Sequence, residues 1–389
     1  MWRLPRLLRH CRVNRNGVRF GRTRHSEDSG QRRRIVRQVT AEIAAALRTR
    51  LQGAPSSSFS QARSADAEVY ELYLAGRQYF NDEKSVRTRR AVESFEQALH
   101  KDPGFAPAYG MLALAYWQQA QRGVAQSKDV QQRIRFAAAK AVELDESRAE
   151  GHVALAFSKM WLDFDWAGSE RERKRALELN PNEPLAYVAW GLNAIGRREF
   201  EEAGKAYRKK LEIDPGSTMS TVAMAYPLMY AGRYDEAIEW LRKAIDKDPN
   251  IPVAYSDLAR VFDLKGQPDR FVVYSLKFAA LSGAPPEQIA MRWNLFHKEG
   301  IEGFRREHLN RQLGRRERGD YVSPVLIAWA YMDLNEVEKA LDWFEKAVDV
   351  RTFQVLWLKS YPGWVEKLKN EPRYHGLLRR MGLEVGSSL

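Results

Sequence analysis

The chain has 389 residues, of which 63 are Lys or Arg and 50 are Asp or Glu, for a formal charge of +13. Hydrophobic residues make up 44% and aromatic residues 11%, which excludes a disordered protein. The single cysteine, Cys11, excludes an intramolecular disulfide framework and a cysteine-based zinc cluster. No uncharged apolar run approaches the ~18 residues that a membrane-spanning helix needs.

The positive charge is concentrated at the amino terminus. Residues 1–50 hold 14 Arg, no Lys and three acidic residues, so they carry +11 of the total +13. We predict that residues 1–32 form a disordered Arg-rich tail, since charge runs of this kind are usually disordered. An arm for nucleic acid or anionic lipid and a targeting peptide are the alternatives. A helix is expected at residues 33–52 and a linker at residues 53–65.

After the amino-terminal segment, similar six-residue sequences recur at a constant spacing, and each of them ends in proline. The sequences ALELNP, KLEIDP and AIDKDP end at Pro181, Pro215 and Pro249, which are 34 residues apart. This is the period of the tetratricopeptide repeat (TPR), a pair of antiparallel helices that stacks on its neighbours. We therefore predict an all-α, right-handed α-solenoid of about eight helix pairs over residues 66–350, followed by a helical cap and tail at 351–389.

Particular residue types recur at fixed positions within each repeat, and they explain why two helices pack together and where each pair ends. Small residues such as Gly191 and Ala203 let two helices approach closely, and Tyr207 fills the gap to the next pair. Asp-Pro or Asn-Pro ends the second helix, because proline restricts the residue before it. Pro227 falls inside the first helix of repeat five, where it clashes with the carbonyl of Ala223 and predicts a kink. Repeat seven, about residues 285–316, keeps few signature residues.

Signatures of catalysis are absent from the sequence. It has no phosphate-binding loop, dinucleotide fingerprint, zinc-protease motif or serine-hydrolase elbow, and its seven histidines are scattered. Asp165 is interpreted as a helix N-cap and His152 as a packed or surface residue. The run at 170–175, ERERKR, is interpreted as a solvated helix face with i,i+4 ion pairs. We expect no catalytic residue, cofactor or metal, and no enzyme.

Three segments resemble a group of bacterial signalling proteins. They are EVYELYLAGRQYFND (68–82), DFDWAGSERERKRALELNP (163–181) and EPRYHGLLRRMGL (371–383). In that group a TPR array follows an effector domain, such as a winged-helix regulator, a class III adenylate cyclase or a kinase, often with a TolB-like domain between them. Nothing before residue 33 resembles an effector domain. The resemblance therefore implies an interaction module, and it implies no reaction.

The concave surface of such an array is the expected binding site, and the first helix of each pair lines it. When the repeats are aligned to the TPR pattern, the positions that face the groove are apolar and aromatic in the middle of the chain. Chaperone-binding members of the family carry Lys and Asn at these positions to hold a terminal carboxylate, and this chain lacks that set. The predicted partner-binding residues are Trp117, Phe157, Met160, Trp161, Leu192, Tyr226, Met229 and Tyr230. The competing interpretation is that these side chains fill the core between repeats or lie under the chain's own amino-terminal helix.

We therefore predict a non-catalytic, cytoplasmic scaffold that binds a partner peptide or helix in the groove, in bacterial signalling or transcriptional regulation. The alternatives are a nucleic-acid-associated regulator that uses the basic tail, and the remnant of a cyclase, kinase or regulator that lost its effector domain.

Overall fold

A computed structural model describes residues 59–81, 85–121 and 128–383. The predicted tail and the predicted helix that follows it lie outside these residues. By its contacts the chain divides into two units, Met1–Ala67 and Glu68–Leu389. The site and all the repeats from Glu68 onward belong to the second unit, and only the start of the first helix precedes it. None of the described helices is both long and apolar enough to cross a membrane.

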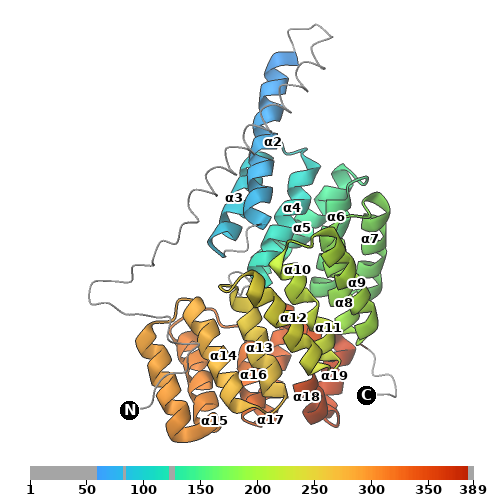
Figure 1. Cartoon of the computed structure of the whole chain (residues 1–389). Coiled ribbons are helices and arrows are strands. Elements are labelled where there is room, and N and C mark those ends of the chain that lie inside the picture. Colours follow the sequence, from blue (N-terminus) through green and yellow to red (C-terminus); the bar gives the residue numbers. More distant parts are fainter. Residues whose placement is uncertain (1–58, 82–84, 122–127, 384–389) are drawn as a thin grey trace, which may run out of the picture. The chain divides into compact units, whose positions relative to one another are not determined.

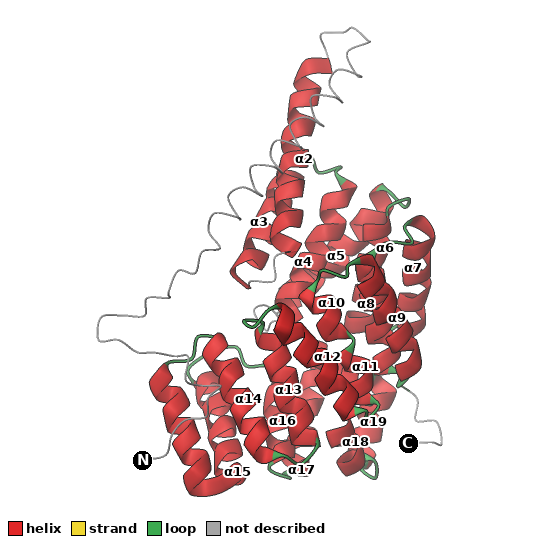
Figure 2. Ribbon diagram, viewed as in Figure 1, coloured by secondary structure: helices red, strands yellow, loops and turns green. Residues whose placement is uncertain are grey.

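The regular elements of the described residues are all helices, and they follow one another as antiparallel pairs (Figures 1 and 2). The pairs are α2 (Phe59–Asn81) with α3 (Ser85–Lys101), α4 (Ala106–Gln121) with α5 (Lys128–Leu144), α6 (Ala149–Ser158) and the π-helical η2 (Lys159–Asp163) with α7 (Trp166–Leu179), α8 (Pro184–Gly196) with α9 (Phe200–Ile213), α10 (Thr218–Ala223) and α11 (Ala225–Tyr230) with α12 (Tyr234–Lys247), α13 (Pro252–Leu264) with α14 (Pro268–Leu281), the two halves of α15 (Pro286–Glu317), and α16 (Pro324–Asp333) with α17 (Val337–Asp349). The predicted all-α solenoid of eight helix pairs is confirmed.

Helix α2 begins at Phe59, within the segment 53–65 that the sequence predicts as a linker. No Pro or Gly follows Pro55 before the first repeat, so nothing in the sequence stops the helix from extending towards the amino terminus. Helix α2 is therefore longer than the repeat period alone predicts.

Two breaks in the helices follow from single residues. The first helix of repeat five is divided at Met224 into α10 and α11, three residues before Pro227, as expected where proline leaves a backbone hydrogen bond unmade, although Met224 itself keeps helical angles (φ −61°, ψ −24°). Helix α15 turns at Gly300, which has φ 69° and ψ −164°, a conformation that glycine adopts without the steric cost of a Cβ atom. The turn gives repeat seven its two antiparallel halves.

Repeat seven does not separate its neighbours on the inner side of the solenoid. The guanidinium of Arg260 on α13 lies 3.8 Å from the ring centroid of Trp329 on α16. From α15, Arg305 forms an ion pair with Asp263 on α13 and donates a hydrogen bond to the carbonyl of Asp333 on α16, at 3.3 Å. The first helices of repeats six and eight therefore meet at Arg260 and Trp329, and Arg305 of repeat seven bonds to both of them.

The local predictions around α7 are also confirmed, except that Arg173 in the charged run is buried and its guanidinium lies 4.8 Å from the ring centroid of Trp190. Asp165 caps α7 by accepting a hydrogen bond from the backbone N–H of Gly168 at 2.7 Å. In the charged run, Lys174 and Glu170 form an i,i+4 ion pair at 2.7 Å. His152 is buried, and its Nδ1 lies 2.8 Å from Glu172.

Close helix contact at Gly191 gives a stability prediction. A Cβ atom at this position would lie 2.3 Å from Cζ of Tyr207, which is fully buried. We expect Gly191→Ala to lower the free energy of unfolding by about 1–3 kcal/mol, because the crowded ring must move. Urea denaturation measures the difference.

The matched control is Gly204→Ala on α9, where the added Cβ meets only the Arg208 guanidinium, at 3.8 Å. This variant should be as stable as the parent chain or about 1 kcal/mol more stable, since Ala is the better helix former. Equal stability of the Gly191→Ala variant and the parent chain would contradict the close contact.

Candidate functional site

The concave surface of the solenoid is formed by the first helices of successive pairs, and it holds all of the predicted binding residues. Trp117 lies on α4, Phe157 on α6, Met160 and Trp161 on η2, Leu192 on α8, and Tyr226, Met229 and Tyr230 on α11. All eight are part of one hydrophobic cluster, in which Tyr226 is partly buried and the other seven are buried. Their burial raises the question of what covers them.

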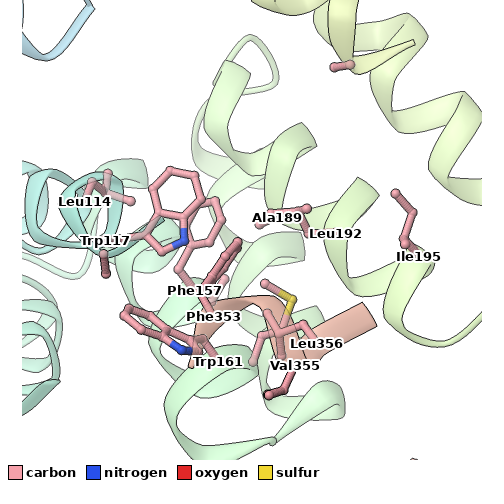
Figure 3. Packing of buried hydrophobic residues seen from close by; sticks show 14 of the residues in the cluster. Leu114, Trp117, Phe157, Trp161, Ala189, Leu192, Ile195, Phe353, Val355 and Leu356 are labelled. Atoms are coloured by element: carbon pink, nitrogen blue, oxygen red, sulfur yellow. The ribbon is translucent and has the colours of Figure 1, made fainter. Parts of the chain in front are cut away.

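The covering element is the chain's own C-terminal segment, residues 351–383. It contains the 3₁₀ helix η3 (Phe353–Trp357), α18 (Pro362–Leu368) and α19 (Pro372–Arg380). Figure 3 shows η3 lying against the predicted groove residues, with Phe353 directed between Trp117 and Trp161. The Phe353 ring centroid is 5.9 Å from that of Trp117 and 5.6 Å from that of Trp161, both edge-on.

The contact continues along the segment. Val355, Leu356 and Leu358 are completely buried. Further along, the ring of Tyr230 on α11 lies 6.4 Å from that of Trp357 and 6.3 Å from that of Tyr361. The apolar half of the concave surface is therefore filled from repeat two to repeat five.

Side chains of the repeats also bind the backbone of the segment. The indole N–H of Trp161 donates to the carbonyl of Arg351 at 2.7 Å, and that of Trp166 donates to the carbonyl of Met381 at 2.7 Å. Arg198 donates to the carbonyl of Lys359 at 3.2 Å. Such bonds satisfy the backbone of an irregular segment, which otherwise could not be buried at low cost.

The beginning of the segment connects the last repeat to the second. The amide of Gln131 on α5 donates to the carbonyl of Val350, immediately after α17, at 2.7 Å. Gln354 donates to the carbonyl of Gln121 at the end of α4, at 3.5 Å. These bonds join parts of the chain more than 200 residues apart and close the solenoid on itself.

The other half of the concave surface is charged. Asp257, Arg260 and Asp263 follow one face of α13 at intervals of three residues. Asp257 is 6% exposed, and its Oδ2 has no hydrogen-bond partner among the described residues. Burial raises its pKa to about 6, although Arg260 and the Tyr226 hydroxyl act in the opposite direction. Burial together with the charge of Asp263 raises the pKa of Asp333 to about 7.

These groups form no site of recognisable chemistry. In the described part of the chain, no three His, Cys, Asp or Glu side chains come together in a way that could hold a metal ion. From α18, Lys367 donates a hydrogen bond to the carbonyl of Met332 at 3.0 Å and lies near the carboxyl of Asp333. The concave surface as a whole is an environment that accommodates a polypeptide segment.

Comparisons with known proteins agree with the repeat period. A family model described as TPR repeat matches residues 227–266, and one described as tetratricopeptide repeat matches residues 325–352, which cover α16 and α17. The chain contains tetratricopeptide repeats. No curated protein matches the sequence.

Several solved structures share the helical architecture. PilW, a type IV pilus biogenesis factor, is 16% identical with a TM-score of 0.42, over 56% of this chain and 96% of that chain. The human IFIT1 dimer with m7Gppp-AAAA is 17% identical with a TM-score of 0.49, over 74% and 72%. TTC0263, a TPR protein in Thermus thermophilus, is 19% identical with a TM-score of 0.41, over 50% and 98%. These similarities carry no conclusion about what this chain binds.

Sequence reasoning missed the occupant of the groove. It predicted residues 351–389 as a terminal cap and considered only the amino-terminal helix as a cover. The available signal was the density of large apolar residues in FQVLWLKSYPGW (353–364), which is higher than a solvated cap requires. Binding of a partner segment at Trp117 to Tyr230 stays a prediction, and it requires that the C-terminal segment leaves the surface.

Removing the Phe353 ring tests how much the segment stabilises the fold. Phe353→Ala should lower the free energy of unfolding by about 3–5 kcal/mol, because it leaves a cavity between two Trp rings. Phe136→Ala is the control, since Phe136 is 61% exposed and its removal should change stability by less than about 0.5 kcal/mol. Thermal and urea unfolding measure both. Equal effects of the two substitutions would show that the segment is not packed as described.

The buried carboxyl of Asp257 gives a pH-dependent prediction. Its pKa rises from the ordinary 3.8 to about 6 on folding, so the folded chain binds this proton more tightly than the unfolded chain. Its contribution to stability therefore falls as the pH rises from about 4 to about 6 and stays low above that range.

Asp257→Asn removes this dependence. The unfolding free energy of the variant minus that of the parent chain should increase between pH 4 and 7, by on the order of 2 kcal/mol. Urea denaturation at several pH values measures the difference. A difference that stays constant over this range would contradict the buried carboxyl.

Proposed function

We propose that this protein is a non-catalytic scaffold that binds a partner protein on the outer surface of its repeats, while its concave surface holds its own C-terminal segment. Tetratricopeptide repeats indicate a protein-interaction scaffold. The observation that supports the outer surface is the filling of the predicted groove by residues 353–358. A partner that used the groove would first have to displace them.

The free energies make this displacement unfavourable. Full burial of a large apolar side chain contributes about 2 kcal/mol. Phe353, Val355, Leu356 and Leu358, each 2% exposed or less, therefore contribute on the order of 8 kcal/mol together. A peptide with micromolar affinity has a total binding free energy of about −8 kcal/mol, so it would gain nothing by exchange. The remaining residues of the segment increase the difference further.

The biological setting is part of the same proposal. The resemblance of residues 68–82, 163–181 and 371–383 to bacterial signalling proteins supports a cytoplasmic role in signalling or transcriptional regulation. The charged helix faces that the repeats turn to solvent, such as that of α7, fit a surface that recognises another folded protein.

A disulfide that holds the C-terminal segment in place tests the proposal. Cysteines replace Gln121 and Gln354, whose hydrogen bond joins α4 to η3, in a Cys11→Ser background that removes the single native thiol. Partners are captured from cells with the oxidised full-length chain and identified by quantitative mass spectrometry. We expect the oxidised and reduced chains to recover the same partners in equal amounts.

The single-cysteine variant Gln121→Cys, treated in the same way, controls for oxidation. Loss of every partner from the oxidised double variant alone would show that partners enter the concave surface. Recovery of no partner from any of the variants would contradict the scaffold function itself.

A further inference from the structure

The outer surface contains a hollow of about 260 Å³ between α9 and α12, with α11 as its floor. We call it the outer groove, and its main lining residues are Phe200, Gly204 and Arg208 on α9, Pro227 and Leu228 on α11, and Trp240 on α12. The hollow lies beside the break between α10 and α11, because Met224, at the break, and Pro227, three residues after it, both line the hollow. The residue that interrupts the first helix of repeat five thus also forms the floor.

Packing within the chain does not require glycine at residue 204, and the absence of a side chain there widens the groove. It lies in the interior of α9, where glycine costs about 1 kcal/mol relative to alanine. A Cβ atom there would meet only the Arg208 guanidinium, at 3.8 Å, so packing within the chain does not exclude a side chain. This differs from Gly191, where the Tyr207 ring leaves no room. The guanidinium of Arg208, the far end of an exposed side chain, lies over the space that the missing side chain leaves at the buried residue 204, so a partner that enters there moves this guanidinium aside.

The walls of the groove are apolar and incompletely covered. Phe200, Leu228 and Trp240 are each only partly buried, although all three pack against the main hydrophobic cluster. Partly exposed large apolar residues that converge on one hollow are typical of sites that receive a side chain from a partner.

The four charged residues at the rim, Glu201, Arg208, Arg233 and Glu236, sum to zero, and only three of them pair with one another. Arg233 donates two hydrogen bonds of 2.7 Å to the carboxylate of Glu236, and it lies 3.6 Å from the carboxylate of Glu201. Arg208, above Gly204, forms no ion pair with any described residue. A partner with a carboxylate at this position would complete the rim.

Resting on the proposed scaffold function, we propose that the outer groove binds an amphipathic helix of a partner protein, which inserts a large apolar side chain over Gly204 and places an Asp or Glu beside Arg208. Two helices form the walls, so a third helix can pack its side-chain ridge between them. The apolar anchor then provides most of the affinity, and the carboxylate selects acidic over basic partners.

The test uses a phage-displayed library of helical peptides with one randomised face, selected on the full-length chain. We expect enrichment of peptides that carry a large apolar residue and an Asp or Glu within one or two helical turns of it. Gly204→Trp fills the groove and should weaken their binding at least tenfold. Gly204→Ala should leave it within about twofold.

The Arg208→Glu variant tests whether reversing this charge also reverses the charge preference of the selected peptides. Selection on this variant should enrich Lys or Arg where the parent chain enriches Asp or Glu, while Lys209→Glu, on the exposed neighbouring residue of α9, should leave the acidic preference unchanged. Circular dichroism and thermal unfolding confirm that the variants are folded. Equal binding to the Gly204→Trp variant, or an acidic preference that persists on the Arg208→Glu variant, would overturn the outer groove as the site.

The proposed scaffold function is judged separately, by the capture of partners with the disulfide-locked chain. Peptides that bind elsewhere on the locked chain would overturn the outer groove and leave the scaffold function intact. Partners that require an open concave surface would overturn both.

Discussion

The insertion of Phe353 between Trp117 and Trp161 is the contact on which the rest of this structure depends. Stacked repeats contact only their neighbours, so a solenoid by itself has an inner surface with nothing to cover it. Here the inner surface is too apolar to remain in water, and residues 351–383 of the same chain cover it. Hydrogen bonds from Trp161 and Trp166 to the backbone of the segment hold it along its length.

This closure changes which surface of the repeats is available. A groove lined by aromatic residues is normally interpreted as a peptide site, and the same residue types also suit a permanent core. Burial distinguishes the two, because a core residue such as Trp161, which is 0% exposed, has no surface left to offer. The proposed partner surface is therefore the outer side, where helix faces are charged and where Met224, at the break, and Pro227 line a hollow.

The charged half of the concave surface places a limit on how tightly the segment is held. Asp257 is buried without a full set of partners, and Asp333 lies close to Asp263, so both carboxyls favour their protonated forms more than exposed acids do. The apolar contacts around η3 are independent of pH. Stability of the closure therefore comes mainly from the apolar half, and the charged half adjusts it.

The sequence by itself determined the features that depend on neighbours along the chain. The 34-residue spacing of Pro181, Pro215 and Pro249 determined the helix pairs, Asp165 the start of α7, and Pro227 the break in repeat five. Each of these rests on backbone geometry within a few residues. The apolar lining of the concave surface could also be predicted, because the repeat period assigns each position to one face of a helix.

Only the tertiary structure decided what fills the concave surface and which residues remain outside. The contacts of Trp161 with Arg351 and of Trp166 with Met381 join residues 190 and 215 positions apart, and no periodic pattern connects them. The stacking of Arg260 on Trp329 likewise joins residues of two repeats that are not consecutive in the sequence. Periodicity indicates which face of a helix is apolar, and the path of the whole chain decides what covers that face.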